Sequence, residues 1–191
     1  MTKYYQIYDD YYLDYGITSG PTLPDGSIMA GKTVEANDLP ELIYEINVPD
    51  DEACPHFMSG ETLIVSGLFI KVLQSEGINN FQTFPAILTN PDTQKKISGY
   101  FLFNLLSLVS AANLNQSSFD VLMDGNTEDG DTPFVAFNQL SLDSEKISGQ
   151  RLFRLAEDPT VLIVDETIKF ALKQNRPEEG WGVIFEELDA E

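Results

Sequence analysis

The sequence contains one cysteine and one histidine in 191 residues, and only 11 lysines and arginines. The single cysteine, Cys54, excludes an intramolecular disulfide framework and suits a reducing compartment. With His56 as the only histidine, the usual acid–base catalyst at neutral pH is nearly absent, and no further cysteine or histidine completes a structural zinc site. These shortages argue against an enzyme and against a metal ion or other cofactor.

Long apolar runs are also missing. The longest stretch, Tyr100 to Ala112, is interrupted by Asn104, Ser107 and Ser110, and it is shorter than the roughly 20 residues that a membrane-spanning helix needs. The first ten residues, MTKYYQIYDD, lack the basic segment and apolar core of a secretory signal. We therefore expect a cytoplasmic protein that does not bind membranes.

Basic residues are outnumbered by 31 acidic ones, which gives a formal net charge of −20. Nucleic acids and anionic membranes should be repelled, whereas a basic partner should be attracted and steered in. Segments 35–61, 120–145 and 178–191 contain eight, seven and six acids, respectively, and no lysine or arginine. They could line one face that receives a cationic partner, or they could be separate solvated segments that only aid solubility.

Two segments of the chain follow the same pattern. LIVSGLFIKVLQSEGINNFQTF begins at Leu63 and LIVDETIKFALKQNRPEEGWGVIF begins at Leu162. In each, an apolar triplet is followed by a short polar residue, Ser66 or Asp165, which is typical of a helix N-cap. Apolar residues then fall at matching offsets, so each segment predicts a structural strand–helix–strand unit.

The rest of the chain predicts further strands. KYYQIYD, PELIYEINVPDD, FVAFNQLSLD and QRLFRLAED have strand patterns, and a hairpin should turn at TNPDTQKK. Residues 9–32 and 115–133 are rich in turn formers and predict loops. We therefore expect a single α+β domain over residues 1–191, with mixed or antiparallel sheets and a few short helices. An arrangement of two closely packed lobes, an acidic part at 1–62 and a second part at 63–187, remains open.

Two motifs resemble chemical sites but fit them poorly. A thiolate nucleophile needs a neighbouring base, and Cys54 and His56 are two residues apart, but Pro55 lies between them and no third orienting group is evident. The acidic run from Asp124 resembles a calcium loop, yet Asp129 stands where glycine is expected and Val135 where a bidentate glutamate is needed. We interpret both as non-catalytic and metal-free.

Partner recognition is instead expected on loops, which present side chains from a fixed scaffold. Tyrosines in the predicted loops offer a rival to charge as the binding determinant, because aromatic residues are frequent hot spots. The acidic candidates are Asp50, Asp51, Glu52, Asp124, Glu128, Asp129 and Asp131, and the aromatic candidates are Tyr11, Tyr12 and Tyr15.

The order of motifs LIVSGLFIKVLQSEG, YFLFNLLSLVSA, RLFRLAE, LIVDETIKFAL and GWGVIFEEL resembles immunity-protein family eleven of bacterial polymorphic-toxin systems. The resemblance covers Leu63 to Glu187, with Trp181 at a position where the family more often has threonine. It implies a small cytosolic protein that binds and neutralises a cognate toxin, without catalytic residues of its own.

The net charge fits a toxin with a basic cleft, because carboxylates can occupy a site made for an anionic substrate. Two other functions remain open at this point: an acidic DNA-mimic regulator of a nucleic-acid-binding protein, and an orphan hydrolase that uses carboxylates. The sequence does not indicate the oligomeric state.

Overall fold

A computed structural model describes residues 2–24, 28–123 and 132–190. Strands make up 39% of the structure and helices 12%, so the predicted α+β class is wrong and the fold is mostly β. The two α-helices have only nine residues each. Many strands are as short as two or three residues and form through their neighbours, so the sequence pattern does not reveal them.

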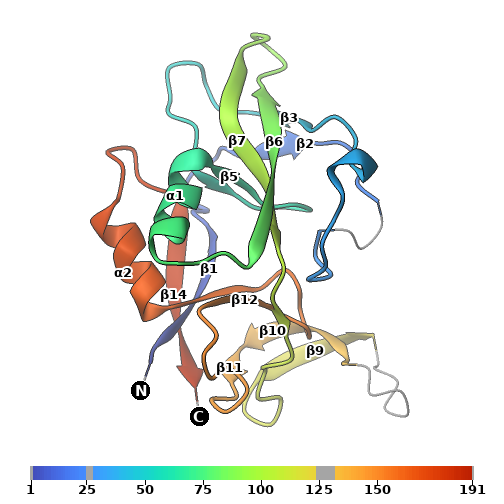
Figure 1. The fold of residues 1–191 in the computed structure, drawn as a ribbon, viewed down its shortest axis with the longest axis vertical. Coiled ribbons are helices and arrows are strands. Elements are labelled where there is room, and N and C mark those ends of the chain that lie inside the picture. Colours follow the sequence, from blue (N-terminus) through green and yellow to red (C-terminus); the bar gives the residue numbers. More distant parts are fainter. Residues whose placement is uncertain (1, 25–27, 124–131, 191) are drawn as a thin grey trace.

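The first sheet brings both ends of the chain together. Strand β1 lies between β13 and β14 and is antiparallel to both, so the two termini are close in Figure 1. The predicted strands at the start and end of the chain are therefore confirmed. In spatial order the sheet contains β11 (Ser141–Leu142), β14 (Val183–Ala190), β1 (Tyr4–Asp9), β13 (Leu162–Asp165), β12 (Leu152–Leu155) and β8 (Leu108–Val109).

The second sheet is built around the predicted hairpin. Its turn is closed by Asn90, whose side-chain oxygen accepts hydrogen bonds from the backbone of Asp92 and Thr93. In β3, Tyr44 and Ile46 are buried between exposed neighbours, which is the alternation of a half-buried strand. The spatial order is β2 (Ile17–Ser19), β3 (Ile43–Ile46), β6 (Phe81–Thr89), β7 (Lys96–Leu105), β5 (Ile64–Ser66) and β4 (Phe57–Met58).

A separate two-stranded sheet projects from the lower part of the molecule in Figure 1. It pairs β9 (Ser118–Met123) with β10 (Phe134–Gln139) in antiparallel fashion. The strand β10 was predicted, but β9 lies inside the segment that we expected to be a loop. A short 3₁₀ helix, η1 (Ala36–Asp38), lies in the connection before β3.

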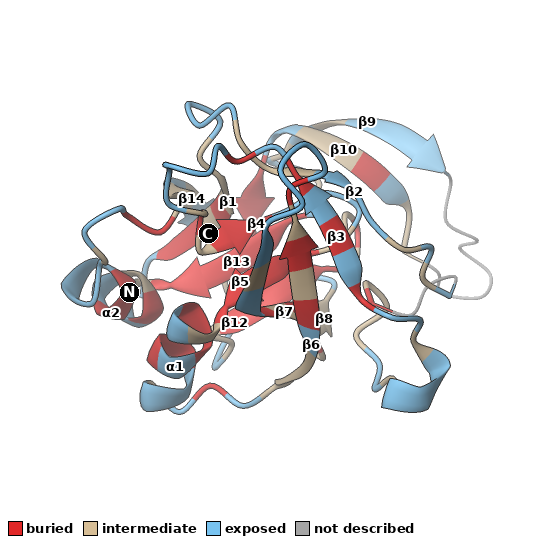
Figure 2. Ribbon diagram, turned by 90° about the horizontal axis from the view of Figure 1, so that it is seen from above, coloured by how far each residue is buried: buried red, intermediate tan, exposed pale blue. Residues whose placement is uncertain are grey.

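The two predicted helix caps are confirmed. The side chain of Ser66 accepts a hydrogen bond from the Phe69 N–H at the start of α1 (Gly67–Ser75). Asp165 accepts one from the Ile168 N–H at the start of α2 (Glu166–Gln174). The helices lie side by side, and they bury the matched pairs Phe69 with Ile168 and Leu73 with Leu172 in one cluster (Figures 1 and 2).

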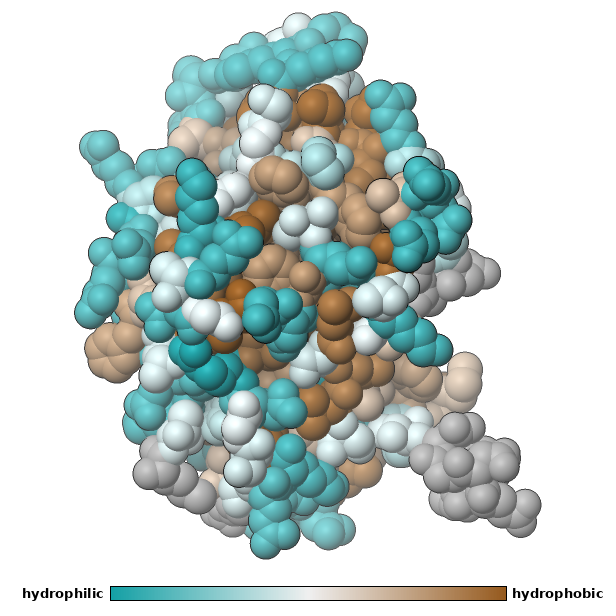
Figure 3. Space-filling view, in the orientation of Figure 1, coloured by the Kyte–Doolittle hydropathy of each residue, from teal (hydrophilic) through white to brown (hydrophobic). Residues whose placement is uncertain are grey.

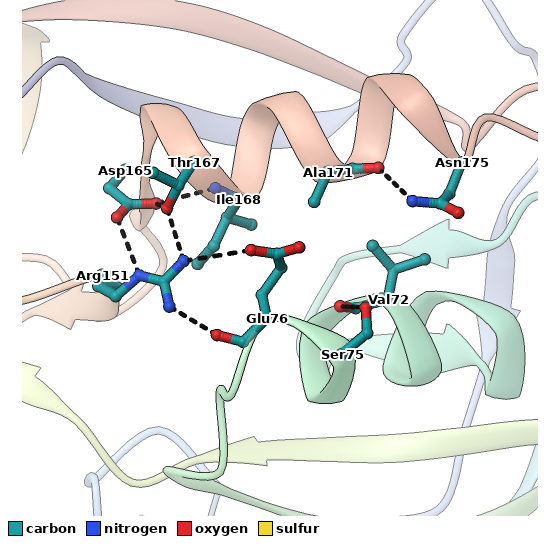
Figure 4. Close-up of polar contacts among 9 residues, drawn as sticks. All are labelled: Val72, Ser75, Glu76, Arg151, Asp165, Thr167, Ile168, Ala171 and Asn175. Carbon is teal, nitrogen blue, oxygen red and sulfur yellow. Dashed lines mark hydrogen bonds and ion pairs between the residues drawn. The ribbon is translucent and has the colours of Figure 1, made fainter.

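Arg151 joins the two strand–helix units at the ends of their helices (Figure 4). Its Nε donates to Asp165 Oδ2 at 3.0 Å, its Nη1 to the Glu76 carbonyl at 2.6 Å, and its Nη2 to Thr167 Oγ1 at 2.6 Å. Every nitrogen of this guanidinium therefore has an acceptor. The network supports the prediction that both units are scaffold.

The largest apolar cluster contains residues of both six-stranded sheets and both helices, including Tyr5, Val65, Phe103 and Leu152. Trp181 lies in the same cluster and donates from Nε1 to the Leu172 carbonyl at 2.6 Å. This shared core supports a single domain over two lobes, although the domain division remains a prediction.

Candidate partner-binding surfaces

Tyr11 and Tyr12 project from the turn that follows β1. Their side chains are 63% and 78% exposed, and their ring centroids are 4.5 Å apart. The ring of Tyr8 stacks on Tyr11 at 6.4 Å, and the Tyr8 hydroxyl donates to the Glu186 carboxylate at 3.4 Å. We call Tyr8, Tyr11 and Tyr12 the tyrosine patch.

The turn that carries the tyrosine patch is fixed by hydrogen bonds. Asp10 accepts from the Tyr12 N–H through its carboxylate and from the Leu13 N–H through its carbonyl. The Asp10 N–H donates to the Gly182 carbonyl, and beyond the turn Asn47 binds the backbone of Asp14 and Gly16. The aromatic rings are thus held in place before any partner arrives.

Two phenols of the patch, those of Tyr8 and Tyr11, have raised pKa values and are neutral at physiological pH. Burial raises the pKa of Tyr8, and the hydrogen bond to Tyr12 raises the pKa of Tyr11. Tyr15, the third predicted tyrosine, instead packs partly against the core of the second sheet. The structure therefore brings Tyr11 and Tyr12 together and separates Tyr15 from them.

The predicted acids Asp50, Asp51 and Glu52 form an exposed turn. Asp50 is tied to the β6–β7 turn, because it accepts from Thr93 Oγ1 at 3.0 Å and lies 3.9 Å from Lys95 Nζ. The negative charge of Asp50 is therefore partly balanced by Lys95 within the protein. The other acidic candidates, Asp124, Glu128, Asp129 and Asp131, lie outside the described residues.

The β9–β10 hairpin has an apolar surface that sequence reasoning missed. Val121, Leu122, Met123 and Phe134 are exposed, and Leu122 is the most exposed of them at 71%. The sequence signal for this surface was the apolar triplet Val-Leu-Met. Because polar residues flank the triplet on both sides, the whole segment was predicted to be a loop. Figure 3 shows apolar groups on the middle of one face, with hydrophilic groups prevailing at its upper and lower ends.

Each of the three base-free acidic segments contributes at least one carboxylate to an ion pair with a lysine. Asp50 pairs with Lys95, Asp143 with Lys146 at 3.4 Å, and Glu187 with Lys3. These pairs are exposed, so each contributes little to stability. The remaining carboxylates far exceed the available cations, and the surface keeps a strong negative charge.

Cys54 and His56 do not form a pair. Cys54 packs against the core of the second sheet, where burial raises the pKa of its thiol and keeps it protonated. His56 instead binds Ser66 Oγ through Nδ1 at 2.7 Å and Glu179 Oε1 through Nε2 at 3.0 Å. The protonated thiol of Cys54 is therefore a poor nucleophile.

The Ser66–His56–Glu179 network has the residue types of a hydrolase triad, but the Ser66 hydroxyl has a structural role as a helix cap. Ser66 is buried, and its Oγ also accepts the Phe69 N–H as the cap of α1. The ring of His56 meets Trp181 edge-on, with centroids 5.3 Å apart. We interpret the network as structural. Within the described ranges, no group of three or more His, Cys, Asp or Glu residues could hold a metal ion.

No helix within residues 2–24, 28–123 and 132–190 has the length and apolar character needed to cross a bilayer. Comparison with curated proteins finds no match to the chain. Residues 16–190 match the model of the immunity protein family Imm11, so the match begins well before Leu63 and includes most of the acidic N-terminal part. The chain therefore belongs to the Imm11 family of immunity proteins.

Proposed function

We propose that this protein binds a cognate bacterial toxin in the cytosol and blocks it, without catalysis of its own. Family membership supports a toxin-immunity role. The observation that best supports direct binding is the tyrosine patch, where two exposed rings are held rigidly beside carboxylates.

The tyrosine patch has the properties of a binding hot spot. Tyrosines provide large contact areas with few rotatable bonds, so they lose little entropy on binding. The rings of Tyr11 and Tyr12 are already ordered by Tyr8 and by the hydrogen-bonded turn. Asp10 and Glu186 lie alongside and would meet cationic groups of a partner.

The net charge of −20 favours a toxin with a basic cleft. Carboxylates that enter such a cleft use the same attraction that binds an anionic substrate, and they would exclude that substrate. Long-range attraction mainly raises the association rate, whereas buried anchors mainly lower the dissociation rate.

A DNA-mimic regulator would present the same charge to another partner, and a carboxylate hydrolase would need a built pair of acids. Within the described part of the chain, no specific observation favours either function over toxin binding. A toxin gene directly beside this one would separate the first alternative from immunity.

The test begins with identifying the partner by affinity capture from the native host and mass spectrometry. Affinity is then measured for the parent and for a Tyr11→Ser, Tyr12→Ser double variant. We expect the double variant to bind at least about 30-fold more weakly, which corresponds to roughly 2 kcal/mol. Its melting temperature should change little, because both side chains are mostly exposed.

Two controls make the result specific. Phe170→Ser removes an exposed aromatic side chain from helix α2 and should leave affinity unchanged. Leu122→Ser with Met123→Ser tests the β9–β10 hairpin as the rival surface. If the tyrosine variant binds normally and the hairpin variant does not bind, the interface lies on the β9–β10 hairpin and not on the tyrosine patch.

A further inference from the structure

A cavity of about 120 Å³ lies between the two six-stranded sheets and is partly open to solvent. One wall comes from β1, β12 and β13, and the opposite wall comes from Phe57, Ser59, Gly60, Thr62 and Leu63. The hydroxyl-bearing residues Ser59, Thr62 and Thr160 line it together with Arg154. The other lining residues are mostly apolar, and in such a pocket a few polar or charged groups decide which ligand binds.

Arg154 occupies a position in β12 where an apolar residue would be expected. Phe153 and Leu155 face the core on one side of the strand, and Leu152 faces the cluster between the sheets. Because side chains alternate along a strand, Arg154 lies on the same side as Leu152. It is only 3% exposed.

The guanidinium of Arg154 is incompletely bound. Its Nη1 donates to the Pro159 carbonyl at 2.7 Å, whereas its Nε has no partner within the described part of the chain. Arg151, three residues earlier, has acceptors on Nε, Nη1 and Nη2 (Figure 4). Because Nε is enclosed by the protein, Nη2 is the donor of Arg154 that remains for an anion, and a hydrogen bond from a charged guanidinium to a carboxylate or phosphate is strong.

The charge of Arg154 is also unmatched. Burial lowers its pKa to about 10, so the group is still cationic at neutral pH. Among the described residues, no carboxylate lines the cavity or pairs with Arg154, although the chain has 31 acids. Asp9 is near the lining, but it accepts the Ser59 N–H at 2.7 and 2.9 Å instead. A buried charge without a partner is costly, and an anion would relieve that cost.

We propose that this cavity is a binding site for a small oxyanion that pairs with the guanidinium of Arg154. A cavity of this volume holds several water-sized groups, so it has room for inorganic phosphate or a small carboxylate. The overall negative charge of the protein opposes any anion, so binding has to come from this local arrangement.

The direct test uses the full-length parent protein labelled with ¹⁵N. The chain has three arginines, so its Nε–H signals can be assigned by single substitutions. Titration with phosphate in chloride buffer should shift the Arg154 Nε–H signal saturably and leave those of Arg151 and Arg176 in place. A parallel titration with acetate separates phosphate binding from carboxylate binding.

Thermal unfolding provides the second readout. Phosphate should raise the melting temperature of the parent in proportion to the logarithm of its concentration, because it binds only the folded state. Arg154→Met should abolish this rise and be at least as stable as the parent in chloride buffer. Arg154→Lys keeps the charge but replaces the guanidinium with a shorter, differently placed donor, so phosphate should bind roughly tenfold more weakly. Arg176→Met is the matched control, because it removes an exposed arginine and should respond like the parent.

An Arg154 signal that neither phosphate nor acetate moves would overturn the proposal. So would a melting temperature that rises equally in the parent and in Arg154→Met. Because the NMR titration needs only the parent protein, the proposal stays testable even if Arg154→Met does not fold.

Discussion

His56 is bound through both ring nitrogens, to Ser66 and to Glu179, and its ring meets Trp181. These contacts place it beneath the start of helix α1, where it supports the helix cap. Cys54 contributes a buried, protonated thiol to a different cluster. At the scale of single residues, the rarest side chains of the sequence therefore serve packing.

A Cys54→Ser, His56→Gln double variant should protect cells from the cognate toxin as well as the parent does. It should lose about 1–2 kcal/mol of unfolding free energy, because glutamine cannot bind both former partners of the imidazole. Survival on co-expression with the toxin and urea unfolding of the purified protein measure the two effects. A folded variant that no longer protects would show that these residues act in function.

Asp9 offers a residue-scale prediction on pH. Burial raises its pKa, while hydrogen bonds from Ser59 oppose the shift. The folded state therefore binds a proton more tightly than the unfolded state, so this group adds stability as pH falls through its folded-state pKa and removes stability above it. Asp9→Asn keeps an acceptor for Ser59 and removes the charge.

We expect Asp9→Asn to be at least as stable as the parent at pH 7 and to lose this advantage toward pH 4. Urea unfolding at both pH values measures the difference between the two proteins. A variant that is clearly less stable at pH 7 would mean that the charged carboxylate stabilises the fold through its hydrogen bonds by more free energy than its burial costs.

The two strand–helix units illustrate what the sequence reveals at the scale of elements. Their caps and buried offsets follow from local rules, and the structure confirms them at Ser66 and Asp165. Strands such as β8 and β11 have two residues each and exist only because a neighbouring strand pairs with them. Those pairings are long-range, which is why the pattern suggested an α+β fold and not a mostly β one.

The candidate sites also differ in whether the sequence alone could reveal them. Tyr11 and Tyr12 were predictable, because they stand in a segment of turn-forming residues. The exposed apolar hairpin was not, since Val121 to Met123 form a strand only through pairing with β10. The burial of Arg154 was equally hidden, because the sequence RLFRLAE does not show which side of β12 meets the second sheet.

The two caps should differ in energetic value. Ser66→Ala removes the acceptor for the Phe69 N–H and should cost about 0.5–2 kcal/mol. Asp165→Ala also takes a charge-assisted bond from Arg151 and a partner from Thr167, so it should cost about 2–4 kcal/mol. Chemical denaturation of both variants, with Asp165→Asn as the cap-preserving control, measures the difference. Equal losses would mean that the Arg151 network adds no stability.

At the scale of the whole molecule, charge and anchors have separate roles. A net charge of −20 acts over about 10 Å at 0.1 M salt, so it guides a basic partner before contact. The tyrosine patch acts only after contact, because its rings must be buried to contribute. Association rate and dissociation rate should therefore respond to different substitutions.

The association rate with the toxin should fall steeply as salt rises, because screening weakens the attraction. Reversing Asp50, Asp51 and Glu52 to lysine should slow association with little change in melting temperature, since all three are exposed. Reversing Glu35, Asp38 and Glu41, which are also exposed, is the matched control with the same change in net charge.

Stopped-flow kinetics over a range of ionic strength distinguishes the outcomes. Equal slowing by both triple variants would assign steering to the overall charge, whereas a larger effect at Asp50–Glu52 would place that turn near the interface. The same comparison applies to Asp124, Glu128, Asp129 and Asp131, which the sequence alone nominates. An association rate that does not depend on salt, combined with lost binding in the Tyr11→Ser, Tyr12→Ser variant, would contradict electrostatic steering and leave the tyrosine patch as the determinant of recognition.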